Sequence, residues 1–355
     1  MRTETLSPVR LQRAKAAYTT RHVELDAART LLTGALQPRS GDLVLAQVSE
    51  IGHHRLLETR TSRKANLFVG DEILISYGNR YAPDQFEAEV PFDLSACHLV
   101  AAGGVAAQVL SQHTRMNPPT SITPLGLLGD HAGRRLNLRD WAFSAPPVKG
   151  PRPRTYAVVG NSMNSGKTTT AANLIHGLTA AGLRVGAAKI TGTGAGGDPG
   201  LFADAGAAVV YDFTHAGFPS TYRATPLEVR RIFETLTGSL AAQDVDTIVL
   251  EIADGIFQEE TRELVVSTTF RKGVDGVLFA AADALSAAYG VKWFSERTLP
   301  LLAVSGLLTA SPLARREAEL ASQAPVLDML TLQAATITEW LAEPCANPKA
   351  QAVAC

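Results

Sequence analysis

The chain has 355 residues, of which 46% are apolar and 19% charged, and its formal net charge is −1. This composition indicates globular domains with a sizeable core, and the small net charge argues against broad electrostatic binding to nucleic acid or to an acidic membrane. No apolar run reaches the roughly 18 residues of a membrane span. The three cysteines, Cys97, Cys345 and Cys355, form no disulfide or zinc pattern, so we expect a cytoplasmic protein.

Residues 1–40 are locally basic, with seven Lys or Arg residues against three Asp or Glu residues. Ser7 followed by Pro8 is typical of a helix N-terminus. An apolar stripe would follow, made of Leu11, Ala14, Tyr18, Leu25, Ala28 and Leu32. We therefore expect an N-terminal helical segment over 1–40 that packs on its own domain or on a second subunit. A transit peptide is the alternative, and the acidic residues Glu24 and Asp26 count against it.

Residues 41–143 predict a β-rich domain, either a small barrel or a twisted antiparallel sheet. Segments 41–48 and 67–77 combine strand-like apolar runs with Gly-Asp turns. The polar and aromatic loop 77–85 interrupts this pattern. Arg80 and Asp84 in that loop could orient a polar substrate, although a self-satisfied turn fits the residues equally well.

A proline-rich stretch over 144–154 predicts a semi-extended linker, because its four prolines cannot continue a helix or a central strand. A second domain then follows over 155–343, and we expect a disordered tail over 344–355.

The most specific motif of the chain opens the second domain. Residues 160–168 read G-x-x-x-x-G-K-T, between the apolar run 155–159 and a helix-forming segment. This strand–loop–helix context is that of a phosphate-binding loop, or P-loop, in which backbone amides and the helix N-terminus bind phosphates. Lys167 would supply a positive charge, and Thr168 a hydroxyl ligand for Mg²⁺. The predicted nucleotide-binding residues are Asn161, Ser162, Asn164, Ser165, Gly166, Lys167, Thr168 and Thr169.

The rest of the second domain alternates apolar runs with helical patterns. Strand-like runs cover 184–189, 207–211, 247–251, 277–280 and 301–305, and residues 226–240 predict a helix. This alternation is typical of an α/β domain with a doubly wound, mostly parallel sheet. Such a sheet binds its ligand at the carboxyl ends of its strands.

Several polar residues end these predicted strands. Glu251 is the best candidate for a second Mg²⁺ ligand, and Asp254 a weaker one. Lys189 could neutralise a transferred phosphoryl group, so the predicted catalytic residues are Lys167, Lys189 and Glu251. The glycine-rich loop 192–197 that follows Lys189 could close over a substrate.

The remaining candidates near this edge are weaker. Thr191 and Asp212, together with Arg80, are candidates for substrate contact. Asp198 precedes a proline and could serve only as a helix cap.

On these residues the second domain resembles the dethiobiotin-synthetase-like branch of P-loop proteins. That branch also includes cobyrinic acid amide synthases and the adaptor of molybdopterin-guanine dinucleotide biosynthesis. Besides the P-loop, Lys189 with Thr191-Gly192 resembles the lysine that contacts phosphate or substrate in the synthetases. The segment 251–255 resembles their Glu-Gly-Ala-Gly-Gly segment, whose glutamate binds magnesium, but Ile252 and Asp254 here replace glycines.

The resemblance implies ATP- and Mg²⁺-dependent phosphoryl transfer to a small molecule by a ligase or kinase. The acceptor could be a carboxylate, activated as an acyl phosphate for amide ligation. Its substrate would lie between loop 192–197 and the first domain, and the protein could be a homodimer. The alternative is a nucleotide-switched accessory GTPase or ATPase for cofactor or metal delivery. An RNA-binding NTPase fits least well, because the chain is almost neutral.

Overall fold

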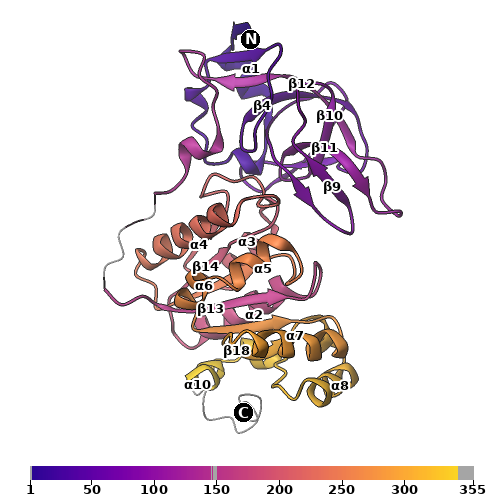
Figure 1. Cartoon of the computed structure of the whole chain (residues 1–355). Coiled ribbons are helices and arrows are strands. Elements are labelled where there is room, and N and C mark those ends of the chain that lie inside the picture. Colours follow the sequence, from indigo (N-terminus) through magenta and orange to yellow (C-terminus); the bar gives the residue numbers. More distant parts are fainter. Residues whose placement is uncertain (1, 145, 147–149, 343–355) are drawn as a thin grey trace. The chain divides into compact units, whose positions relative to one another are not determined.

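The computed structural model describes residues 2–144, 146 and 150–342. The chain divides into two compact units, which are described separately (Figure 1). The first takes residues 1–144 together with the segments 192–197 and 213–223, and the second takes 145–191, 198–212 and 224–355. The predicted tail and residues 145 and 147–149 of the predicted linker lie outside the described residues. Among the described residues, no helix combines the length and hydrophobicity that a bilayer crossing requires.

The first unit consists mainly of strands. They are β1 (Arg2–Thr5), β2 (Lys15–Ala16), β3 (Thr30–Thr33), β4 (Leu43–Glu50), β5 (Leu56–Glu58), β6 (Lys64–Asn66), β7 (Glu72–Tyr77), β8 (Arg80–Tyr81), β9 (Phe86–Glu89), β10 (Cys97–Ala101), β11 (Val105–Gln112) and β12 (Thr120–Gly129). Helix α1 (Pro8–Arg13) and the short 3₁₀ helices η1 (Tyr18–Thr20), η2 (Leu25–Ala27) and η3 (Leu138–Trp141) complete it.

Five of these strands form a closed ring. β12 pairs with β4, β4 with β7, β7 with β11, β11 with β10, and β10 again with β12. Inward-facing apolar residues of the ring, among them Val44, Ile75, Leu99, Ile122 and Leu127, belong to one buried cluster. Closure satisfies the backbone of each strand on both sides and encloses this core. The predicted β-rich region is therefore a small barrel.

The prediction of a helical segment over 1–40 is wrong. Within residues 2–40, which the structure describes, the only α-helix is the six-residue α1. β1 pairs antiparallel with β3, which in turn pairs with β12 of the barrel. Leu31 and Leu32 are both buried, on opposite sides of β3. The helical spacing of the apolar residues was misleading because the barrel edge offers a strand partner, and tertiary pairing overrides a weak local pattern.

The second unit alternates strands and helices. Its strands are β13 (Arg154–Gly160), β14 (Val185–Lys189), β15 (Val209–Asp212), β16 (Thr247–Ile252), β17 (Gly276–Ala280) and β18 (Leu301–Ser305). Its helices are α2 (Lys167–Ala180), α3 (Gly197–Asp204), α4 (Pro226–Ala241), α5 (Glu259–Val265), α6 (Thr268–Gly273), α7 (Ala284–Glu296), η4 (Leu307–Ala310), α8 (Pro312–Ser322), α9 (Met329–Gln333) and α10 (Ile337–Ala342).

The six strands form one parallel sheet in the order β15-β14-β16-β13-β17-β18. Every residue of β16 and β17 is buried, so helices cover both faces of the sheet. The predicted doubly wound α/β domain is confirmed. β13 lies between β16 and β17. From β13 the chain runs to β14 and β15 on one side, and after β16 it crosses to β17 and β18 on the other side. This reversal creates the crevice at the carboxyl ends of the strands in which such folds bind ligands.

The C-terminal helices cap this sheet domain. Leu332 in α9 and Ile337 and Leu341 in α10 are buried in the same cluster as Leu174 and Leu178 of α2. Their apolar surface is used within the unit.

Candidate functional site

The P-loop is built by the meeting of β13 and α2. β13 ends at Gly160, and α2 begins at Lys167 with Gly166 as its N-cap. Gly166 has a φ of 92°, in the left-handed region that favours glycine. The turn therefore reverses the chain within a few residues and presents the amides of the first turn of α2. A 14-residue helix presents a positive dipole end here, which favours an anion.

Backbone hydrogen bonds hold this loop from three directions. Asn161 N donates to Ala280 O at the end of β17 (3.0 Å), and Ile256 N donates to Gly160 O (3.0 Å). Leu307 N donates to Ser165 O (2.9 Å). The loop is thus fixed to neighbouring segments of the same unit, as a preorganised phosphate site requires.

A pocket of about 450 Å³ opens over the loop. It is lined by Met163, Asn164, Gly166, Lys167, Thr168, Thr169, Lys189, Asp198, Glu251, Ala253, Asp254 and Leu307. All three predicted catalytic residues and all three predicted metal ligands line this one pocket. β14 and β16 are hydrogen-bonded neighbours, and Lys189 is in register with Glu251, which explains why residues 62 positions apart meet there.

The charged groups of the pocket are buried. Only 5% of Lys167 is exposed. Its Nζ donates to the Ser162 carbonyl oxygen of its own loop (2.7 Å). Burial lowers the pKa of Lys167, and the nearby Glu251 partly offsets this. An anionic phosphate oxygen would be a stronger acceptor for the same ammonium than a neutral carbonyl.

Glu251 and Lys189 form the electrostatic centre of the pocket. Lys189 Nζ lies 3.7 Å from Glu251 Oε1 and makes a closer ion pair with Asp198. Burial lowers the pKa of Lys189, but the carboxylates of Glu251 and Asp198 raise it more, so its pKa lies above the usual range. Burial raises the pKa of Glu251, and Lys189 offsets only part of that effect. The lysine therefore remains protonated, with two carboxylates competing for it.

The surroundings of Glu251 fit a magnesium ion. Thr168 Oγ1 donates to Glu251 Oε1 (3.2 Å), whereas Oε2 is buried and has no hydrogen-bond partner among the described residues. The Thr168 hydroxyl and the Glu251 carboxylate together provide hard oxygen ligands, which Mg²⁺ prefers. No group of three or more His, Cys, Asp or Glu side chains among the described residues could hold a metal by itself. Mg²⁺ would thus depend on phosphate oxygens and water for its remaining ligands.

The other predicted residues lie outside the pocket lining. Asn161, Ser162 and Ser165 belong to the P-loop, but the Asn161 amide bonds to Ser162 Oγ and the Ser165 hydroxyl is buried. Thr191 is buried and donates to the Ala253 carbonyl, and Asp212 is buried at the end of β15. Arg80 belongs to the first unit, where it is buried and donates to Gln85 Oε1 (2.7 Å).

Asp198 is the functional candidate that the sequence interpretation undervalued. It lies in the first turn of α3 and pairs with Lys189, instead of serving only as a cap. Met163 and Leu307 also line the pocket. One feature of the sequence could have identified Asp198. It directly follows the glycine-rich loop 192–197, which begins three residues after Lys189.

Loop 192–197 is held within the first unit. Gly196 N donates to the Glu58 carboxylate, and Gly194 N donates to Pro219 O (2.8 Å). A methyl group on Gly103 would overlap the carbonyl oxygen of Gly194. The loop therefore packs directly against the rest of the first unit at Gly103, and the substrate position between the two stays a prediction.

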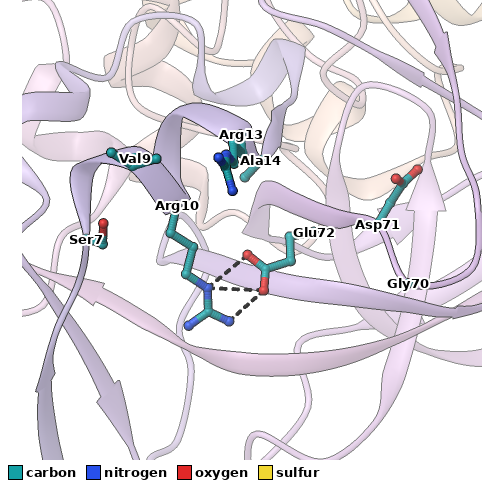
Figure 2. A pocket seen from close by; sticks show the side chains of 8 residues that line it. All are labelled: Ser7, Val9, Arg10, Arg13, Ala14, Gly70, Asp71 and Glu72. Carbon is teal, nitrogen blue, oxygen red and sulfur yellow. Dashed lines mark hydrogen bonds and ion pairs between the residues drawn. The ribbon is translucent and has the colours of Figure 1, made fainter.

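A second hollow, of about 500 Å³, lies in the first unit beside α1 and the start of β7. Figure 2 shows the Arg10 guanidinium reaching the Glu72 carboxylate, with Arg13 and Asp71 apart from this pair. The three contacts of the pair measure 2.6–3.1 Å. Asp71 pairs with Lys15. Both carboxylates of this hollow thus have a cationic partner, so it is a weaker candidate for ligand binding.

No protein-family model matches the chain, and no curated protein matches it. Among solved structures, it is similar to the signal recognition particle receptor FtsY from Elizabethkingia anophelis in complex with GDP, with 23% identity and a TM-score of 0.35; the match covers 53% of this chain and 60% of that one. It is also similar to the signal recognition particle 54 kDa protein from Aeropyrum pernix K1 in complex with GDP, with 20% identity and a TM-score of 0.37, over 59% of this chain and 49% of that one. The chain thus spans about half to three fifths of these two proteins.

The second unit is a P-loop nucleotide-binding domain. Its own features define this class: the G-x-x-x-x-G-K-T loop between a central parallel strand and a helix, and an acidic residue at the end of the adjacent strand β16.

Proposed function

We propose that the protein is a Mg²⁺-dependent nucleoside triphosphatase whose nucleotide state is passed from the second unit to the first. One observation carries this proposal. Lys189 and Asp198 pair with each other in the P-loop pocket, and the segment between them, 192–197, belongs to the first unit. A change at this pair is therefore linked through the backbone to the barrel unit.

The residues of the pocket divide the work of nucleotide binding. Lys167 and the N-terminal amides of α2 would bind the phosphates, and Thr168 and Glu251 would hold Mg²⁺. Bound Mg²⁺ would neutralise charge on the phosphate oxygens during transfer to water. Lys189 would supply the second positive charge.

Lys189 would also sense the terminal phosphate. The ammonium of Lys189 is shared between Asp198 and Glu251. A triphosphate offers it a competing anion, and Asp198 would lose its partner as that contact forms. Hydrolysis and phosphate release would restore the pair, which gives two states that differ in their contacts, as a nucleotide switch requires.

The second candidate function is phosphoryl transfer from ATP to a small molecule, as in the dethiobiotin-synthetase-like branch. The position of Lys189 supports it, since two lysines at one pocket could stabilise a phosphoryl group during transfer. The acceptor would be a small metabolite, for example a carboxylate. The switch is the better supported of the two, because it also accounts for the assignment of loop 192–197 to the first unit.

Nucleotide turnover and hydrogen exchange separate these functions. ATP and GTP hydrolysis with Mg²⁺ would be followed with and without an extract of small metabolites, and amide exchange of 192–197 would be compared with and without a non-hydrolysable triphosphate. The switch predicts slow, metabolite-independent hydrolysis and a changed exchange of 192–197. Metabolite-dependent ADP formation with unchanged exchange would support phosphoryl transfer instead.

A further inference from the structure

Glu58, at the end of β5 in the first unit, is a buried carboxylate with a single partner. Only 7% of the residue is exposed. Both of its oxygens accept from the Gly196 amide, at 3.1 and 3.0 Å. Among the described residues, no other donor and no cationic side chain pairs with it. A carboxylate buried against one neutral amide costs stability, so its contribution to folding does not explain its presence.

The surroundings of Glu58 accommodate glycines but no larger residues at the contact with loop 192–197. A Cβ on Gly196 would lie 2.5 Å from both Glu58 Oε1 and Ser62 Oγ. The carbonyl of Gly194 packs where a side chain on Gly103 would be. We call Glu58, Ser62 and Gly103 the loop seat. The seat and the loop belong to the same unit and fit each other closely.

A short stretch of backbone connects the seat to the P-loop pocket. Asp198 lies two residues beyond Gly196, so their Cα atoms are at most roughly 7 Å apart. Asp198 belongs to the first turn of α3 and pairs with Lys189. A displacement of Gly196 by several ångströms would therefore act on Asp198 through a single intervening residue, Gly197.

We propose that Glu58 is a positioning residue that holds Gly196, keeps Asp198 paired with Lys189, and thereby opposes the transfer of Lys189 to the terminal phosphate of a bound triphosphate. This inference rests on the proposed function of the pocket. By linkage, the coupling acts in both directions: a triphosphate that takes Lys189 from Asp198 weakens the hold of Glu58 on Gly196. The seat is then the element through which the first unit responds to nucleotide.

The test measures binding of fluorescent ATP, GTP, ADP and GDP analogues, the triphosphates non-hydrolysable, to the full chain. In Glu58→Ala, triphosphate affinity should rise about fivefold or more, the lower range of allosteric coupling, with little change for diphosphates. A residue with a merely structural role would weaken both or change neither. Unchanged or weaker triphosphate binding in a folded Glu58→Ala protein would overturn the inference.

Two further variants keep the test decisive. Glu58→Gln retains an oxygen acceptor for the Gly196 amide, so its affinity should lie closer to wild type. Gly196→Ala keeps the carboxylate but crowds it, and should act in the same direction as Glu58→Ala even if that variant folds poorly. Asp42→Asn is the matched control, because Asp42 is also a buried acid of the first unit but its carboxylate bonds to Arg39, Arg135 and Asn137, away from loop 192–197.

Hydrogen exchange without nucleotide separates this inference from the proposed function. Amides 194–199 should exchange faster in Glu58→Ala than in wild type and should be unchanged in Asp42→Asn. Equal exchange in all three proteins would overturn the role of Glu58 whatever the pocket binds. If wild type bound no nucleotide, or Lys167→Ala bound it equally well, the proposed function would fail instead.

Discussion

Two hollows, one in each unit, are of similar size but differ in how their charges are satisfied. The hollow beside α1 measures about 500 Å³ and the P-loop pocket about 450 Å³, and each contains an ion pair. In the first, Arg10 and Glu72 are partly exposed and satisfy each other. In the second, Glu251 is 1% exposed and keeps an oxygen with no partner.

This difference shows that volume alone does not identify a binding site. Exposed pairs contribute little because water screens them, whereas a buried charge with an unsatisfied acceptor is costly unless a ligand completes it. The unsatisfied Oε2 of Glu251 therefore identifies the P-loop pocket as the better candidate for ligand binding. The predictions below test the contrast between the two hollows.

The largest effect is expected from Lys167→Ala. Loss of a preorganised charge at a transferred phosphate typically costs about 100-fold or more in turnover. We expect at least that loss of nucleotide hydrolysis. Circular dichroism should stay unchanged, because the Lys167 ammonium bonds a carbonyl of its own loop and takes no part in the strand and helix hydrogen bonds. Turnover at the wild-type rate would disprove the site assignment.

Glu251→Gln should affect magnesium more than nucleotide. Changes in residues that only support a metal ligand cost 10- to 100-fold, so loss of a direct ligand should raise the Mg²⁺ concentration for half-maximal turnover by about tenfold or more. Nucleotide binding without Mg²⁺ should change less. If the magnesium titration stayed as in wild type, the metal role would move to another carboxylate, such as Asp254 or Asp212.

A smaller effect is expected from Asp198→Asn. Removing this charge leaves Lys189 available to phosphate, so triphosphate affinity should rise about fivefold. The double variant with Glu58→Ala should gain little beyond either single variant, because both changes act on one interaction. Fully additive effects in this double-mutant cycle would mean that Glu58 and Asp198 act independently.

The smallest effect is expected from Arg10→Ala. Its pair with Glu72 is solvent-exposed, with 43% of the arginine side chain accessible, so the free energy of unfolding should fall by less than about 1 kcal/mol. Denaturant titration measures this, and nucleotide turnover should equal that of wild type. A marked loss of turnover would show that the α1 hollow also serves the nucleotide reaction.

Local patterns predicted the parts of the molecule in which short-range signals and tertiary structure agree. Residues 247–251 and 277–280 read as buried strands, and they form β16 and β17. Thr225-Pro226 with Glu228 is a capping box, and α4 begins at Pro226 as expected. The helix prediction over 1–40 was wrong. The spacing of its apolar residues fitted a helix, but pairing with β12 made residues 30–33 a strand.

Sequence by itself determined the chemistry of the phosphate-binding loop, because the motif is contiguous and its neighbours along the chain already specify a strand, a tight turn and a helix. It also determined the parallel α/β class and placed Lys189 and Glu251 at strand ends. Only the tertiary structure decided that Asp198 pairs with Lys189 and that segment 192–197 is held by Glu58 in the first unit. The physical reason is that both contacts depend on how the glycine-rich loop folds in space. Glu58 lies 138 positions from Gly196, and although Lys189 and Asp198 are only nine positions apart, no local periodicity encodes the loop path that brings them together.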